Sequence, residues 1–231
     1  MLKFVEKLGI TIVALFCLSY WMQSSVTQAQ EAPIIRCLPN VTSGRVSCEY
    51  GNGDKYIGAF ANGLPNGDGI YIYTNGDRFI GPFRNGLPNG QGQFIFKDDT
   101  RIQGVFSNGR ISRGEAIFTN GTRYVGEFAT TGAVGTFQGR GELSFPNGER
   151  FEGQFLQGSP LGPGVFIGSD QTRCQGDFYN SNFDGRGSCT FPNGSRYEGE
   201  LRSGVPGGFG TLVDSNGRRS QGLFQDGRLI P

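Results

Sequence analysis

Apolar and polar residues alternate along most of this chain in short runs, and each run ends at a turn signal. Tyr56 and Phe60 alternate with smaller residues, and Tyr71 and Tyr73 repeat the pattern a little further on. A period of two predicts β-strands that place these rings on one face. Asn75-Gly76 follows, and this dipeptide is a strong hairpin signal because a type I′ turn needs a positive φ at both central residues. The sequence therefore predicts β-hairpins.

The hairpin pattern returns with a nearly fixed period. An aromatic-x-Gly-x-Phe motif, or a close variant of it, begins about every 23 residues, with one longer step of 27. Its first positions are Tyr56, Phe79, Ile102, Tyr124, Phe151, Cys174, Tyr197 and Ser220. A period of about 20 to 50 residues is typical of stacked repeats, which usually present surfaces for binding.

We expect an all-β fold, an elongated single-layer antiparallel meander of about eight 23-residue β-hairpin repeats over residues 44–231. Short connectors favour antiparallel pairing of successive strands. Glycine midway between two aromatics, as at Gly58, lets rings from adjacent strands lie across the backbone. The rings are then the core, and stability is approximately a sum over neighbouring repeats.

The N-terminus has the pattern of a secretory signal peptide. Lys3 and Lys7 precede an apolar run over residues 8–22, and Thr27-Gln28-Ala29 provides small residues before a cleavage site. We predict a signal peptide over residues 1–29 and a linker or N-terminal cap over residues 30–43. The chain would then be exported, either secreted or periplasmic. The alternative is an uncleaved membrane anchor at residues 8–22, although a span needs roughly 20 residues.

Four cysteines remain once that segment is set aside, and an even count in an exported chain suggests disulfides. They are Cys37, Cys48, Cys174 and Cys189. The most local of the three connectivities joins the first pair and the second pair. The alternative is four reduced, buried thiols. Metal binding is a weaker interpretation because the chain has no Cys-x-x-Cys and no histidine.

A basic residue stands directly before the motif in every repeat. The eight positions are Lys55, Arg78, Arg101, Arg123, Arg150, Arg173, Arg196 and Arg219. They point away from the rings and recur every ~10 Å, about one Debye length. One interpretation is a cation track for lipid phosphates or another polyanion at Lys55, Arg78, Arg101 and Arg123. The other is a solvated face whose charges pair with neighbouring acids, which only the later repeats supply, at Glu152, Asp177, Glu198 and Glu200.

The complete repeat reads Tyr-x-Gly-x-Phe, then Asn-Gly, a second Gly-x-Gly and an aromatic, as in residues 56–71 and 79–94. This pattern resembles the MORN repeat family (membrane occupation and recognition nexus) over residues 44–231. It departs from the family at Cys174 and Ser220, which replace the first aromatic, and at Leu201, which replaces the closing Phe. The resemblance implies a single-layer β array that acts in binding or scaffolding, and some members of the family bind acidic phospholipids.

The composition gives catalysis no support. The 231 residues include no histidine, so the most common general base and the Ser-His and Cys-His arrangements are absent. A net charge of +1 does not favour nucleic acid as a partner. The Asn-Gly-Asp turns at Asn52 and Asn75 are explained by turn chemistry without calcium. We therefore expect no enzyme activity, no cofactor and no metal site.

These observations favour a non-catalytic scaffold that mediates protein–protein interaction in an exported or membrane-associated setting. Its partner would be another protein or a second copy of the chain. The alternative is peripheral binding of anionic phospholipid headgroups through the basic ladder. A third class, glycan binding by the aromatic rows, is disfavoured because the only tryptophan, Trp21, lies in the signal segment.

Overall fold

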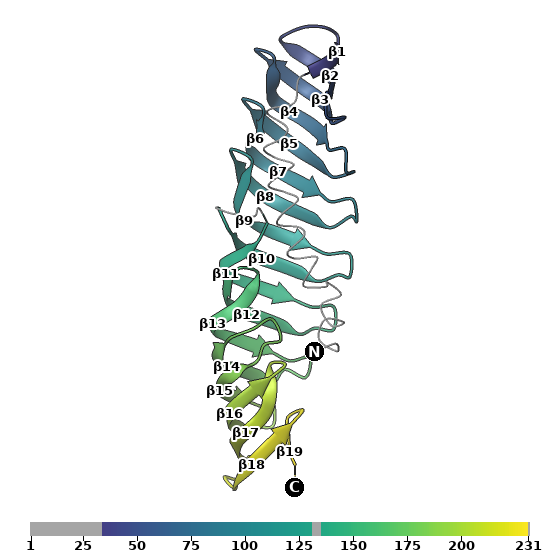
Figure 1. Cartoon of the computed structure of the whole chain (residues 1–231). Helices are drawn as coiled ribbons and strands as arrows, with labels where there is room; N and C mark the ends of the chain where they lie inside the picture. Colours follow the sequence, from purple (N-terminus) through teal and green to yellow (C-terminus); the bar gives the residue numbers. More distant parts are fainter. Residues whose placement is uncertain (1–33, 131–134, 231) are drawn as a thin grey trace. The chain divides into compact units, whose positions relative to one another are not determined.

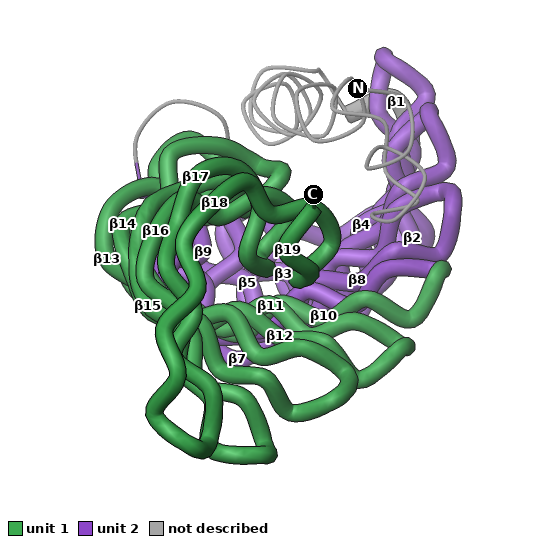
Figure 2. The backbone as a smooth tube through the Cα atoms, turned by 90° about the horizontal axis from the view of Figure 1, so that it is seen from below, with its two compact units in different colours: residues 1–11, 120–126, 137–231 green, residues 12–119, 127–136 purple. Residues whose placement is uncertain are grey.

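The computed structural model describes residues 34–130 and 135–230, and every element in them is a β-strand. The strands belong to one open antiparallel sheet of nineteen strands, so the predicted all-β, antiparallel fold is confirmed. The chain divides into two compact units (Figure 2). The described residues of unit 2 are 34–119, 127–130 and 135–136, and those of unit 1 are 120–126 and 137–230.

Successive strands of unit 2 pair with one another in chain order (Figure 1). They are β1 (Ile34–Leu38), β2 (Gly44–Tyr50), β3 (Lys55–Ala61), β4 (Leu64–Ile72), β5 (Arg78–Arg84), β6 (Leu87–Pro88), β7 (Gly90–Ile95), β8 (Arg101–Ser107) and β9 (Arg110–Ile117). Strand β5 pairs with both β6 and β7 because the second strand of that repeat is interrupted. Each repeat is thus a hairpin that continues directly into the next.

Unit 1 has the same plan. Its strands are β11 (Phe137–Ser144), β12 (Arg150–Leu156), β13 (Ser159–Ile167), β14 (Arg173–Phe178), β15 (Gly185–Thr190), β16 (Arg196–Arg202), β17 (Val205–Val213), β18 (Arg219–Gln225) and β19 (Arg228–Leu229). Strand β10 (Arg123–Phe128) begins in unit 1 and ends in unit 2. In both units the hydrogen-bonded neighbours are neighbours in sequence, as the short connectors predict.

The aromatic rings lie on one face of the sheet, above the glycines. Tyr56 is fully buried, and its ring covers Gly58 and Gly69, which face each other across β3 and β4. A Cβ on Gly58 would stand 2.5 Å from the Tyr56 hydroxyl oxygen. Phe151 covers Gly153 and its partner on β13 in the same way. The prediction that glycine admits the rings is confirmed.

The two ends of each hairpin use different turns, and here the sequence interpretation was wrong. We expected the type I′ turn at Asn75-Gly76, but only Gly76 there has a positive φ. At Asn62-Gly63, between β3 and β4, both residues have positive φ, 52° and 78°. The type I′ geometry therefore joins β3 to β4. The Asn75-Gly76 turn is a tight turn closed by Gly76 N–H donating to the Tyr73 carbonyl at 2.9 Å.

The type I′ turns also bond to one another from repeat to repeat. The Gly86 N–H donates to the Pro65 carbonyl at 2.9 Å, and the Gly109 N–H donates to the Pro88 carbonyl at 2.9 Å. In unit 1, the Gly204 N–H donates to the Phe183 carbonyl at 3.0 Å. These bonds fix the spacing of successive hairpins within each unit.

At the opposite end of the hairpins, a buried aspartate ties each of the first two turns to the turn that follows. Asp54 is 4% exposed, and its carboxylate accepts hydrogen bonds from the Thr74 N–H at 2.8 Å and the Tyr71 hydroxyl at 2.9 Å. Burial, and then the Asp54 charge, raise the pKa of Tyr71 well above its ordinary value, so its hydroxyl remains a donor. Asp77 repeats the contact by accepting from the Lys97 N–H at 2.8 Å. The turn aspartates are therefore structural.

Replacing Asp54 with alanine is expected to lower the free energy of unfolding by about 1 to 3 kcal/mol, because the buried Tyr71 hydroxyl and the Thr74 N–H lose their acceptor. Urea denaturation measures the change. Asp68→Ala is the matched control, since that aspartate is exposed on β4 and should change stability by less than about 0.5 kcal/mol. Equal losses in the two variants would contradict the structural role of Asp54.

Two disulfides pair the four cysteines locally. Cys37 on β1 bonds to Cys48 on β2, and Cys174 on β14 bonds to Cys189 on β15. Cys174 and Cys189 are each 1% exposed and occupy positions that carry a ring in other repeats. The first disulfide ties β1, which forms within the segment expected to be a linker or cap, to the sheet.

The predicted signal peptide or anchor at residues 1–29 lies outside the described residues. In the part of the chain that the structure describes, no helix has the length and apolar character needed to cross a membrane.

Candidate binding surface

The face of unit 2 opposite the rings is exposed over much of its area, although Ile95 on this face is only 4% exposed. We call this open face of strands β3 to β9 the basic face. Lys55 on β3, Arg78 on β5 and Arg101 on β8 define its basic row. Ile57 on β3, Ile70 on β4 and Ile80 on β5 define a neighbouring isoleucine row, two residues further along the strands.

Isoleucines alternate with the cations along the basic row. Ile72 on β4 lies opposite both Lys55 and Arg78 in the sheet register, and Ile95 on β7 lies opposite both Arg78 and Arg101. Neighbouring strands are about 4.8 Å apart, so the aliphatic stems of the cations run beside isoleucine side chains. This arrangement holds the charged ends at the surface.

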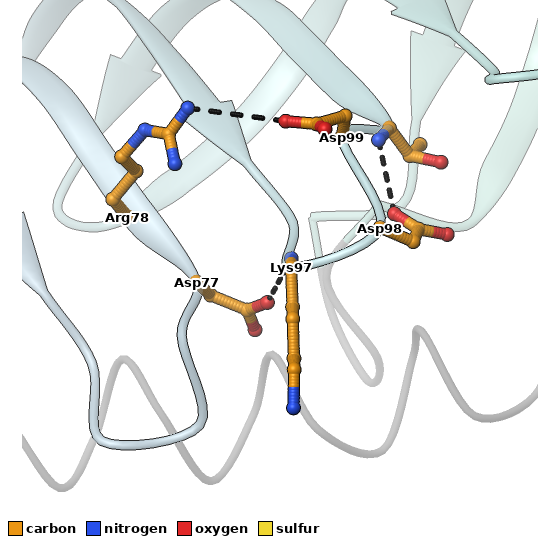
Figure 3. Close-up of polar contacts among 6 residues, drawn as sticks. Asp77, Arg78, Lys97, Asp98 and Asp99 are labelled. Carbon is orange, nitrogen blue, oxygen red and sulfur yellow. Dashed lines mark hydrogen bonds and ion pairs between the residues drawn. The ribbon is translucent and has the colours of Figure 1, made fainter.

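The cations of the basic row are weakly neutralised. The Arg78 guanidinium reaches Asp99 only at 4.0 Å, and the Asp99 side chain is 71% exposed (Figure 3). The Asp98 carboxylate is hydrogen-bonded within the turn, where it accepts a hydrogen bond from the Thr100 N–H at 2.9 Å (Figure 3). Among the described residues, no carboxylate oxygen comes within 4.0 Å of the charged groups of Lys55 or Arg101. An exposed, loose pair such as Arg78–Asp99 contributes little.

The isoleucine row is the apolar part of the surface. Ile57 pairs directly with Ile70, and Ile70 with Ile80. Ile57 is 47% exposed and Ile80 is 39% exposed, although both lie mid-strand. The row becomes polar further on, at Gln93 and Gln103, and ends on β9 at Glu115, which accepts a hydrogen bond from Gln103 Nε2 at 2.6 Å. Three adjacent strands therefore carry a continuous apolar strip beside the cations.

Unit 1 has a different open face. The row equivalent to the isoleucines is made of Glu142, Glu152, Val165, Gln175, Ser188, Glu198, Thr211 and Gln221. Arg150 forms an ion pair with Glu152 at 3.5 Å. Acids interspersed with bases are typical of a solvated face. The apolar strip beside the cations is therefore a feature of unit 2.

The structure places three of the four predicted polyanion-binding residues on one surface. Lys55, Arg78 and Arg101 share the basic face of unit 2, whereas Arg123 belongs to unit 1 and has contacts of its own. Sequence reasoning missed Ile70 and Ile72, because only the strand register shows that they stand between the motif positions of successive repeats. The signal available in the sequence was the run of alternating isoleucines at Ile70 and Ile72.

The isoleucine row of this surface can make apolar contacts with a partner, and the basic row can form ion pairs with it. Within residues 34–130 and 135–230, no group of three cysteine, aspartate or glutamate side chains is placed to hold a metal ion. Asp54 and Asp77, the acids in the Asn-Gly-Asp turns, are already hydrogen-bonded to backbone N–H groups.

A protein-family model for the MORN repeat matches residues 56–78, 79–101, 135–150, 151–173, 174–196 and 197–218, more than half of the chain. The chain belongs to the MORN repeat family. Six repeats match, two fewer than the predicted count of about eight. The unmatched repeats begin at Ile102 and Ser220. The Ile102 repeat still forms a hairpin, with β8 paired to β9.

The solved structures that match this MORN protein are distant from it in sequence. The wild-type TCP10 domain of Danio rerio CPAP, solved with a peptide of Danio rerio STIL, is 15% identical, with a TM-score of 0.49 over 79% of this chain and 81% of that chain. The SAS-4 TCP domain of Drosophila melanogaster, solved with a proline-rich motif of Ana2, is 14% identical, with a TM-score of 0.41 over 70% and 88%. Both scores are below 0.5, and nothing about this chain follows from them. The comparison with curated proteins found no match.

Proposed function

We propose that this MORN protein is a non-catalytic scaffold that binds a protein partner through the basic face of unit 2. The observation that carries the proposal is the isoleucine row, an exposed apolar strip on three adjacent strands beside weakly neutralised cations. The ring face of the sheet is filled by its own side chains. The open face is therefore the surface left for a ligand.

The composition of the basic face resembles the centre of a protein interface. Contiguous exposed apolar side chains on a soluble domain mark interaction sites, and interface centres are depleted in charge while arginine is enriched around them. Ile57 and Ile80 supply the apolar centre, and Arg78 and Arg101 stand along its border. The equivalent strip of unit 1 has glutamates in these places.

An exported or membrane-associated setting fits the two disulfides. Disulfides persist in oxidising compartments and are rare in the cytosol of most organisms. Each disulfide joins two adjacent strands. It therefore stabilises a single hairpin and does not link segments that are distant in the sequence. The proposal places the scaffold outside the cytosol, where such bonds are kept.

The proposal is tested by chemical cross-linking in extracts of the source organism, with the captured protein quantified by mass spectrometry. The face variant Ile57→Ser with Ile80→Ser should capture at least about tenfold less partner, because two partly buried isoleucines contribute roughly 1.5 to 3 kcal/mol each. The control variant Phe209→Ser with Leu223→Ser removes two equally exposed apolar residues of unit 1. Equal capture by both variants would contradict the proposal.

A second candidate is peripheral binding of anionic phospholipid. The specific observation in its favour is that Lys55 and Arg101 have no carboxylate partner among the described residues. Sedimentation with vesicles that contain about 30% phosphatidylserine tests it, since each cation near such a surface contributes about 1 kcal/mol. Binding that survives high salt, or that survives Lys55→Glu with Arg78→Glu and Arg101→Glu, would exclude the lipid role.

A further inference from the structure

We propose that the segment recognised by the basic face is an acidic amphipathic α-helix that lies across the strands. This inference rests on the proposed function, since it names the chemistry of the protein partner. Three features of unit 2 carry it: the spacing of the cations, the position of the isoleucine row beside them, and the weak neutralisation of the cations.

The spacing of the cations matches the heptad of an α-helix. Lys55, Arg78 and Arg101 lie on alternate strands, β3, β5 and β8, with one strand between each pair. Two strand separations are about 9.6 Å. Seven residues of an α-helix rise about 10.5 Å. A helix perpendicular to the strands therefore brings every seventh residue over one cation of the row.

A β-strand does not fit the same row. A strand advances about 3.3 Å per residue, so a step of about 10 Å corresponds to three residues. Side chains of a strand alternate between its two faces, and residues three apart point in opposite directions. Only every second cation of the row would then meet an acid of a β-strand partner. The periodicity of the surface therefore excludes a β-strand.

The isoleucine row provides the second stripe that an amphipathic helix needs. Ile57 lies two residues after Lys55, and Ile80 lies two residues after Arg78, a displacement of about 7 Å along each strand. Helix positions i+3 and i+4 lie about one turn beyond position i along the axis, on opposite sides of it. With acids at every seventh position over the cations, one of these two positions in each heptad faces the isoleucine side, so leucines there contact the isoleucine row.

The acids of this face lie away from the basic row or make no close contact with it. The third row of the same strands includes Ala59, Pro82 and Val105, together with the exposed Asp68, which lies opposite Pro82. Glu115 on β9 already accepts a hydrogen bond from Gln103 Nε2 at 2.6 Å. Glu49 on β2 lies opposite Lys55, but their charged groups are more than 4.0 Å apart. The isoleucine row is thus apolar, with cations along one side.

The partner's length follows from the extent of the row. Lys55 and Arg101 are separated by four strand steps, or about 19 Å. Three acids in heptad spacing, at i, i+7 and i+14, span about 21 Å of helix. A segment of about 15 to 20 residues, four to six turns long, is therefore long enough to cover the row.

The test uses two synthetic peptides of equal composition and length, both stapled to be helical. One carries glutamate at i, i+7 and i+14 with leucines at i+3 and i+4 of each heptad, and the other has the glutamates spaced by five. Fluorescence anisotropy with the whole chain measures affinity. We expect the heptad peptide to bind at least about tenfold tighter, since three aligned ion pairs and a matched apolar stripe are lost in the second peptide.

The variant Lys55→Glu with Arg78→Glu and Arg101→Glu should remove that advantage. The matched control is Arg173→Glu with Arg196→Glu and Arg219→Glu, the equivalent exposed cations of unit 1, which should retain it. Unchanged circular dichroism shows that each variant is folded. A tenfold preference for the heptad peptide over the other peptide that disappears only in the unit 2 variant supports an α-helical partner.

Two other outcomes would overturn the inference in different ways. In the first, both peptides bind equally well and the unit 2 variant binds neither. This result excludes recognition of the heptad spacing but leaves the basic face as a protein-binding surface. Binding of neither peptide, with binding of phosphatidylserine vesicles, contradicts both the helix and the protein partner. The failure of this inference is thus distinguishable from failure of the proposed function.

Discussion

Replacing Phe151 with alanine is expected to lower the free energy of unfolding by about 3 to 5 kcal/mol. Phe151 is fully buried and lies over a glycine pair, where no side chain from the strand below can fill the space. Its ring contacts Phe155, Phe178 and Phe183 at centroid distances of 5.5, 5.1 and 5.1 Å. Loss of the ring therefore removes contacts in its own repeat and the next. Urea denaturation followed by circular dichroism measures the change.

The matched control for this variant is Phe209→Ala. Phe209 is also a phenylalanine of unit 1 within a strand, but it is on the open face and 51% exposed. Its replacement should change stability by less than about 1 kcal/mol. Similar losses for the two variants would mean that the buried rings are not the core of the sheet.

Removing the second disulfide, by Cys174→Ser with Cys189→Ser, is expected to lower stability by about 3 kcal/mol, the value for a loop of about 15 residues. The two cysteines are 15 residues apart in sequence and replace the ring pair of one repeat, so the bond substitutes for aromatic contacts. Thermal unfolding in the absence of reductant measures the change.

The control for the disulfide variant is the chain with Cys37→Ser and Cys48→Ser, examined with and without dithiothreitol. In that background Cys174–Cys189 is the remaining disulfide of the described residues, so reductant should lower its melting temperature as the double serine variant does. A melting temperature that is insensitive to reductant would contradict a stabilising role for this bond.

Much of the fold follows from the sequence because two local signals agree. Alternation with a period of two predicts strands. A glycine recurs at the same place in each strand, and these glycines lie opposite each other in neighbouring strands, as Gly164 and Gly176 do. The ring face and the opposite basic row follow from the same alternation. These features depend on residues close in sequence, so one chain is enough to predict them.

Other features depend on geometry that the sequence does not display. Asn-Gly occurs at both ends of a hairpin, at Asn62-Gly63 and Asn75-Gly76, and only the φ values show which is the type I′ turn. Phe183 lies in a connector with a φ of 54°, unusual for a bulky residue, and yet it is 1% exposed and packs on Phe166 at 5.2 Å. Tertiary packing outweighs the local preference at that position.

The candidate surface was predictable only in part, for the same reason. The basic residue before each motif and the neutral residues of the first repeats are visible in the sequence. The isoleucine row is not, because Ile70 belongs to the second strand of a repeat and joins Ile57 and Ile80 only through the register of β3, β4 and β5. The charge pattern suggested a polyanion, whereas the register adds an apolar strip and favours a protein.

The most direct test of the basic face as a binding surface is a methyl spectrum of the chain with isoleucine δ1-methyl groups labelled with ¹³C, recorded as the acidic heptad peptide is added. The account predicts shifts at Ile57, Ile70 and Ile80, with none at Ile167, which is buried in unit 1. Shifts confined to unit 1, or a spectrum unchanged at the three isoleucines, would contradict it.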